Sequence, residues 1–99
     1  MAPFDAQQAR AKLQSQPHWE LNADATTIAR EFTFGNFMQA FAFMTHVAIA
    51  AEKRNHHPEW RNVYNRVHIT WTTHDAQGLT DNDVAMAALC DAAFAGYQP

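Results

Sequence analysis

The sequence of 99 residues predicts a single α+β domain, residues 1–99, with a four-stranded antiparallel sheet and helices packed on one of its faces. Three observations favour this class. Apolar residues recur at helical spacing over residues 37–55. Apolar and polar residues alternate over residues 67–72, as in a strand. Two hairpin-like stretches are each followed by a helical stretch, so the expected order is α-β-β-α-β-β-α.

The first third of the chain predicts a peripheral helix and a hairpin. Residues 4–15 are rich in helix formers, and Pro17 ends that element. Residues 18–22 alternate in polarity, and residues 22–24 favour a turn. Residues 26–34 then place Ile28, Phe32 and Phe34 on one side of a second strand.

Residues 37–55 predict a long helix that is apolar around much of its circumference. Its expected core stripe comprises Phe37, Phe41, Met44, Ala48 and Ala51, widened by Ala40 and Val47. Met38, Phe43 and Ile49 lie away from the centre of that stripe. A helix this apolar in so short a chain is expected to contact a second subunit as well as the core.

The last third predicts a second hairpin and a final helix. Residues 61–64 and 67–73 read as strands around a turn at Asn65 and Arg66, with β-branched residues prominent in the second. Thr80 and Asp83 have the spacing of a capping box. An Ala-rich helix over residues 84–95 follows, and Gly96 is suited to end it.

Composition and charge exclude several classes of protein. The net charge is −3 with neutral histidines, and no basic block occurs, so direct nucleic-acid binding is not expected. The single cysteine, Cys90, excludes an internal disulfide framework. The longest apolar stretch, residues 37–51, is interrupted by polar side chains and no signal segment opens the chain, so we expect no membrane association and a cytoplasmic location.

His56 and His57 directly precede Pro58, which disfavours further helix. Two imidazoles therefore lie at the expected end of the long helix, and His74 follows the second hairpin. One interpretation is structural, because cationic rings complement the partial negative charge of a helix end. The other is catalytic, since imidazoles transfer protons near neutral pH. The spacing alone leaves both open.

Other chemistries have little support in the sequence. It contains no HExxH or CxxC motif, so no metal site is expected. Cys90 lies among Ala and Leu residues of a helix and is expected to be a small buried hydrophobe. Three glycines do not form a phosphate loop. Acid–base catalysis by histidines remains the most direct hypothesis.

Two carboxylates are candidates to assist these histidines. Glu52 lies one helical turn before His56, and this spacing would place it beside that ring. The alternative is a surface pair with Lys53 or Arg54. Asp83 has a competing role as the capping partner of Thr80.

Residues 52–60, which read Glu-Lys-Arg-Asn-His-His-Pro-Glu-Trp, together with Tyr64, His74 and Asp83, resemble the signature of pterin-4a-carbinolamine dehydratases. The resemblance extends over most of the chain. It implies dehydration of 4a-hydroxytetrahydropterin to quinonoid dihydropterin, which recycles the pterin cofactor of aromatic amino-acid hydroxylases. It also implies a homodimer or homotetramer joined through helices, with no metal and no bound cofactor.

The resemblance further implies residue roles. His56, His57 and His74 would be the catalytic residues that line the pterin site, with proton transfer assigned to His57 and His74 and orientation to His56. The residues implied to contact the pterin are Asn55, His56, His57, Thr72, Thr73, His74 and Asp75. Those implied to support the site are Glu52, Asp83 and Trp19. Asn55 stands where animal members frequently have Asp.

A second hypothesis is a binding module. Animal members of the family that the sequence resembles also act as dimerisation cofactors of a homeodomain transcription factor, through their helical surface. Here that surface would include Met38 and Phe43.

Overall fold

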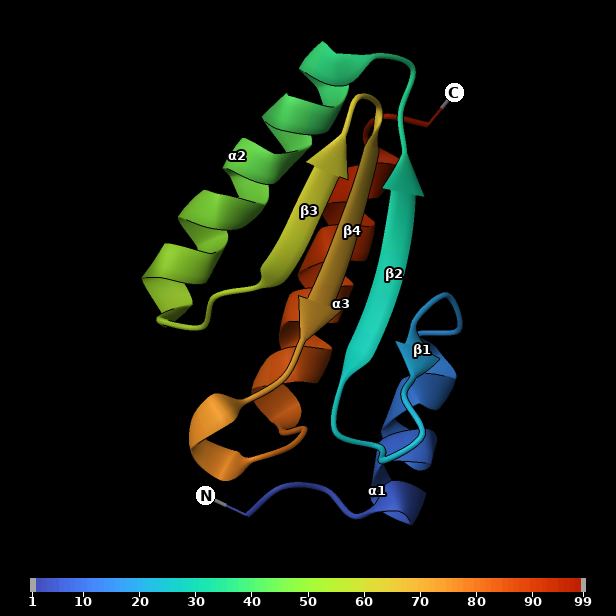
Figure 1. Cartoon of the computed structure of the whole chain (residues 1–99), viewed down its shortest axis with the longest axis vertical. Coiled ribbons are helices and arrows are strands. Elements are labelled where there is room, and N and C mark those ends of the chain that lie inside the picture. The colour runs from blue at the N-terminus through green and yellow to red at the C-terminus, as the bar shows by residue number, and fades with distance from the viewer. Residues whose placement is uncertain (1, 99) are drawn as a thin grey trace.

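The computed structural model describes residues 2–98 and has the predicted α+β fold and element order (Figure 1). The helices are α1 (Ala6–Lys12), α2 (Phe37–Arg54) and α3 (Asp81–Ala95). The strands are β1 (Glu20–Leu21), β2 (Ile28–Thr33), β3 (Glu59–Val63) and β4 (Arg66–Trp71). Two short 3-10 turns, η1 (Leu13–Ser15) and η2 (His74–Ala76), complete the chain.

The four strands form one antiparallel sheet in the order β1-β2-β4-β3. The two predicted hairpins are β1–β2 and β3–β4, and pairing of β2 with β4 joins them. The first strand is shorter than predicted, because the backbone N–H of Trp19 donates to the carbonyl of Gln16 in the preceding turn and pairing begins only at Glu20. Helix α3 lies behind the strands in Figure 1, and α2 contacts both α3 and β4, so one face of the sheet is covered.

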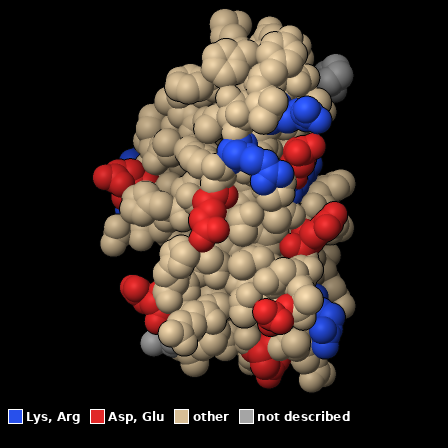
Figure 2. Space-filling view, viewed as in Figure 1, with Lys and Arg blue, Asp and Glu red and all other residues tan. Residues whose placement is uncertain are grey.

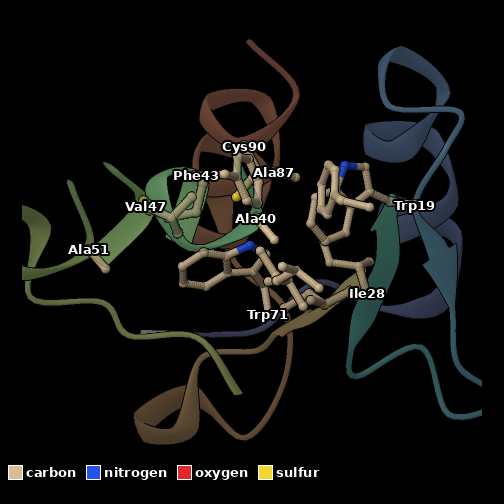
Figure 3. Packing of buried hydrophobic residues seen from close by; sticks show 14 of the residues in the cluster. Trp19, Ile28, Ala40, Phe43, Val47, Ala51, Trp71, Ala87 and Cys90 are labelled. Atoms are coloured by element: carbon tan, nitrogen blue, oxygen red, sulfur yellow. The ribbon is translucent and has the colours of Figure 1, made fainter. Parts of the chain in front are cut away.

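The core lies between the covered face of the sheet and the two long helices (Figure 3). The strands contribute alternate residues, and Trp71 of β4 is the largest side chain that is fully buried. Helix α3 contributes Met86, Ala87 and Cys90. Cys90 is fully buried, which confirms the prediction of a small buried hydrophobe, and this burial raises the pKa of its thiol to about 12.

The predicted core stripe of α2 is wrong in part. Its buried residues are Ala40, Phe43, Val47 and Ala51. Phe43 packs against Phe32 and Phe34, with ring centroids 4.9 and 5.0 Å away. Phe37 and Phe41 are instead about half exposed, at 48% and 55%. Because the helix is apolar on nearly every side, its own periodicity does not determine which side meets the sheet.

The exposed side of α2 is therefore apolar. It carries Phe37, Met38, Phe41 and Ile49, each at least 48% exposed. No helix within residues 2–98 is long and apolar enough to cross a membrane.

Candidate active site

The end of α2 determines where the two adjacent histidines point. Asn55 adopts the left-handed conformation, with φ 51° and ψ 44°, and its backbone N–H donates to Ala51 and Glu52 carbonyl oxygens. Asn is one of the few residues other than Gly that adopt this conformation readily. The helix therefore ends at Arg54, one residue before Asn55. The side chains of His56 and His57, which follow Asn55, point in different directions.

His56 turns inward, and its side chain is only 10% exposed. Its Nε2 lies 2.6 Å from Oδ1 of Asp83. Its ring stacks on that of Trp71, with centroids 5.5 Å apart and planes inclined by 13°. An ionised carboxylate only accepts hydrogen bonds, so Nε2 carries the proton and Nδ1 is the nitrogen left for other partners.

Asp83 is fully buried, and both of its carboxylate oxygens take part in hydrogen bonds. Its Oδ2 accepts the backbone N–H of Thr80 at 2.9 Å and the hydroxyl of Thr73 at 2.8 Å. The Thr73 and Thr80 hydroxyl oxygens are 2.8 Å apart. A buried carboxylate requires several hydrogen bonds, because burying it without them costs free energy. The capping box is confirmed, and the same carboxylate also holds His56, so the two interpretations of Asp83 hold together.

The predicted partner of Glu52 is wrong. Its Oε1 lies 2.7 Å from Nε2 of His57 rather than beside His56, and it forms no pair with Lys53 or Arg54 within residues 2–98. The physical reason is the left-handed residue Asn55, which turns His56 away from the helix and returns His57 toward it. Both members of the Glu52–His57 pair are more than half exposed.

His74 begins the 3-10 turn η2, which a short bridge closes. The backbone N–H of Thr73 donates to Gly78 at 2.9 Å, and the N–H of Gly78 donates back at 3.3 Å. His74 Nε2 lies 3.2 Å from Oε2 of Glu59, at the start of β3. Sequence reasoning gave Glu59 no role, because only the pairing of β3 with β4 brings it beside the end of β4.

One hollow of about 310 Å³ lies between the end of α2 and the segment after β4. Its lining contains all seven residues that the resemblance assigns to substrate contact, together with Pro58 and Glu59. Glu52 and Asp83 are not among the lining residues, but each contacts a histidine that is. The hollow thus brings His74 to His56 and His57, although His74 follows His57 by 17 positions in the sequence.

Trp19 does not line this hollow. It is buried near the opposite edge of the sheet, where its indole N–H donates to Oδ1 of Asp91 at 2.9 Å. Within residues 2–98, none of the hydrogen bonds of Trp19 reaches a residue of the hollow, so the supporting role of Trp19 stays a prediction. Other hollows lie on the uncovered face of the sheet, away from His56 and His57. They surround His68, which pairs with Glu31 of β2 on one side and with Arg61 of β3 on the other.

The chemistry available in the histidine hollow is proton transfer. Each of the three imidazoles contacts a carboxylate through Nε2, which leaves its Nδ1 as the second nitrogen. His56 is held by burial and stacking, whereas His57 and His74 are 55% and 74% exposed. Within residues 2–98, no three His, Cys, Asp or Glu side chains are grouped closely enough to hold a metal ion.

Comparison with known proteins shows what this arrangement is similar to. The family model described as pterin 4 alpha carbinolamine dehydratase matches residues 2–93. Proteins provisionally named pterin-4-alpha-carbinolamine dehydratase are similar over nearly their full lengths. The one from Burkholderia orbicola (strain MC0-3) is 49% identical over 95% of this chain and 92% of its own. The one from Sinorhizobium fredii (strain NBRC 101917 / NGR234) is 50% identical, over 97% and 91%.

Solved structures show the same similarity. A crystal structure titled transcriptional coactivator/pterin dehydratase, from Brucella melitensis, superposes with a TM-score of 0.88 at 37% identity, covering 92% of this chain and 97% of that one. A pterin dehydratase-like protein, titled a RuBisCO assembly factor in the alpha-carboxysome, superposes with a TM-score of 0.67 at 26% identity, covering 81% and 92%.

Proposed function

The chain belongs to the pterin-4a-carbinolamine dehydratase family, and we propose that it removes water from a 4a-hydroxytetrahydropterin to give the quinonoid dihydropterin. The observation that carries this proposal is the meeting of His56, His57 and His74 in one hollow. The reaction needs a proton donor and a proton acceptor, and these imidazoles can serve as either near neutral pH.

The reaction proceeds by acid–base catalysis. A protonated imidazole donates to the C4a hydroxyl, the C–O bond breaks, and water leaves. A neutral imidazole, or a water molecule beside it, removes the proton from a ring nitrogen, so the proton given is balanced by the proton taken. His57 and His74 are assigned to these transfers, because their exposed rings can exchange protons with solvent between turnovers.

His56 is assigned to substrate binding and orientation. Its ring is fixed between Trp71 and Asp83, so it presents Nδ1 from a constant position. Asn55 and the segment from Thr72 to Asp75 supply the remaining contacts with the pterin ring. In the cell a separate two-electron reduction would convert the quinonoid product back to the tetrahydropterin cofactor of an aromatic amino-acid hydroxylase, and a cytoplasmic location is part of this proposal.

The test is a stopped-flow dehydration assay with carbinolamine substrate generated by a hydroxylase. We expect the purified protein to accelerate water loss well above the spontaneous rate. A rate equal to the spontaneous one, measured with a correctly folded protein, would contradict the proposed activity.

The exposed apolar side of α2 supports a second proposal, self-association into a homodimer or homotetramer. Phe37, Met38, Phe41 and Ile49 form a surface that is unusual for a monomer. We expect light scattering to give a mass of at least twice 11.2 kDa, and Phe41→Glu to lower it. A monomeric wild-type protein at micromolar concentration would exclude this assembly.

The same surface supports the alternative that the protein is a binding module. The titles of the two solved structures describe one relative as a transcriptional coactivator and the other as an assembly factor. Met38 is 72% exposed and could meet a partner, but Phe43 is fully buried, so the prediction that Phe43 contributes to that surface is wrong. The dehydration assay separates the two functions.

A further inference from the structure

A hollow on the uncovered face of the sheet, which we call the arginine hollow, lies at the opposite end of β4 from the histidine hollow. Its volume is about 180 Å³, and its lining residues are Glu31, Arg61, Val63, Arg66 and His68. Arg66 begins β4, whereas Thr72, in the lining of the histidine hollow, directly follows β4. At about 3.3 Å per residue, the chain spans about 20 Å between these two positions. The two hollows are therefore separate sites.

The strand register brings the charged side chains of the arginine hollow together. Glu31, His68 and Arg61 lie directly opposite one another across β2, β4 and β3. Arg66 lies two positions before His68 on β4, so both side chains point to the same face of the sheet. The residues opposite Arg66 on the neighbouring strands carry no charge. Two guanidinium groups and one imidazole therefore share the hollow with one carboxylate.

The arginine hollow is positive in both protonation states of its histidine. Counted over the lining residues alone, one positive charge is in excess when His68 is neutral, and two are in excess when it is protonated. The next acidic residue along β3 is Glu59, which contacts His74 instead. Glu20 of β1 borders a neighbouring hollow. Figure 2 shows this face, with basic side chains gathered over its upper part, near the turn between β3 and β4.

Hydrogen bonds hold the backbone that carries the two arginines. The side-chain amide of Asn62 donates to the carbonyl oxygens of Tyr64 at 3.1 Å and Arg66 at 2.8 Å, across the turn between β3 and β4. The side chain of Asn65 donates to the carbonyl of Phe34 at 2.9 Å, and the N–H of Phe34 donates to the carbonyl of Asn65 at 2.9 Å. The turn is thus tied to β2 as well, which lowers the entropy lost when a ligand binds.

We propose that the arginine hollow binds a phosphate dianion, either free phosphate or the phosphate group of a small monoester. Guanidinium groups donate paired hydrogen bonds to phosphate oxygens. Within residues 2–98, neither Arg61 nor Arg66 forms an ion pair that would compete. Attraction to a positive hollow grows with the charge of the anion, so a dianion is preferred to a carboxylate. Val63, which is 58% exposed, offers an apolar surface to the carbon chain of a monoester.

The size of the expected changes follows from Coulomb's law. One unit charge about 4 Å from a dianion in water changes its binding roughly thirtyfold, and screening or a longer distance reduces this to roughly fivefold. Arg61→Gln and Arg66→Gln should each weaken phosphate binding within this range. Glu31→Gln should tighten binding instead, because it removes a carboxylate from the lining. A gain of affinity does not arise from partial unfolding, so this variant guards against that explanation.

A phosphate titration at low ionic strength tests this site. Inorganic phosphate or glycerol phosphate is added at pH about 8, where phosphate is mostly doubly charged, and heteronuclear NMR spectra follow the backbone amides. Saturable shifts are expected at Arg61, Arg66 and His68, with a dissociation constant on the order of 1 mM for the wild-type protein. Similar constants for the two ligands identify a monoester site, and binding of inorganic phosphate alone identifies a free-phosphate site.

The matched control is Arg10→Gln. Arg10 is exposed in the last turn of α1 and does not line the arginine hollow, so this variant removes an equal charge elsewhere. It should leave the dissociation constant within about twofold of the wild type, because distant exposed charges are screened.

Three results overturn the proposal. The first is the absence of saturable shifts in the arginine hollow at phosphate concentrations well above the expected dissociation constant. The second is equal weakening by Arg10→Gln and Arg61→Gln, which would show that binding follows only the net charge of the molecule. The third is weaker rather than tighter binding by Glu31→Gln. The titration contains no pterin, so its outcome is independent of the dehydration assay.

Discussion

Asp83 and Asp91 lie on the same helix, α3, and both tie it to the rest of the fold, but their partners differ. Asp91 accepts from Arg30 at 2.6 Å and from the Trp19 indole at 2.9 Å. Asp83 meets His56 and hydroxyl groups. Arg30 is always charged and also stacks over aromatic rings, whereas an imidazole titrates. A fixed-charge pair therefore serves the fold toward one end of the helix, and at the other end a buried imidazole of the histidine hollow is held in place.

The largest effect should come from the exposed histidines at the Asp83 end. His57→Ala or His74→Ala should lower turnover by roughly 10²–10⁴ and leave the fold intact, because each removes a proton-transfer group that is not part of the core. Stopped-flow assays and circular dichroism measure the two properties. His46→Ala, an exposed position on α2, is the control. Wild-type rates in both site variants would contradict the assignment.

Asp83→Ala should affect both stability and activity. It leaves His56, Thr73 and the N-terminus of α3 without their common acceptor, and removing one member of a buried pair costs about 3–5 kcal/mol. Urea denaturation measures the loss, and the turnover of the folded fraction should also fall.

The control for Asp83→Ala is Asp81→Ala in the same first turn of α3. Asp81 is exposed, and within residues 2–98 it pairs only with Lys12, at 3.2 Å. It should change the free energy of unfolding by less than about 1 kcal/mol. Similar losses in the two variants would show that helix N-terminal charge, rather than the buried network, explains the effect.

Asp91→Ala should be destabilising but should not change the chemistry. The side chains of Asp91 and Arg30 are 25% and 14% exposed, so water offsets part of the loss and we expect about 1–3 kcal/mol. The turnover of the folded enzyme should stay within about twofold of the wild type, because Asp91, Arg30 and Trp19 are not among the residues that line the histidine hollow. A large fall in turnover of fully folded protein would remove the contrast between the two ends of α3.

Glu52→Gln should give the smallest change. The Glu52–His57 pair is exposed, and such pairs contribute about 0–1 kcal/mol to stability. Turnover should nevertheless fall a fewfold, since the carboxylate orients His57. Unchanged turnover would indicate that Glu52 is only a surface partner.

Sequence reasoning predicted most of the fold because its signals were local. The alternation that predicts β4 and the Thr80–Asp83 spacing that predicts the start of α3 each depend on a few neighbouring residues. The buried side of α2 was not predictable in this way. Phe43 is buried because Phe32, Phe34 and Phe94 arrive from other elements.

The candidate site shows the same limit at a finer scale. The resemblance identified the residues that line the hollow, but not which carboxylate each histidine contacts. Glu52 meets His57 because one backbone residue, Asn55, is left-handed. Glu59 meets His74 because of the register of two strands, and sequence spacing reports neither feature.

The contacts of Asp83 make the site depend on the last helix. This one side chain joins the end of α2, the segment after β4 and the start of α3. A chain that ends before residue 80 keeps all three histidines but has no acceptor for His56. Catalytic competence should therefore require the docking of α3, although none of the residues of α3 lines the hollow.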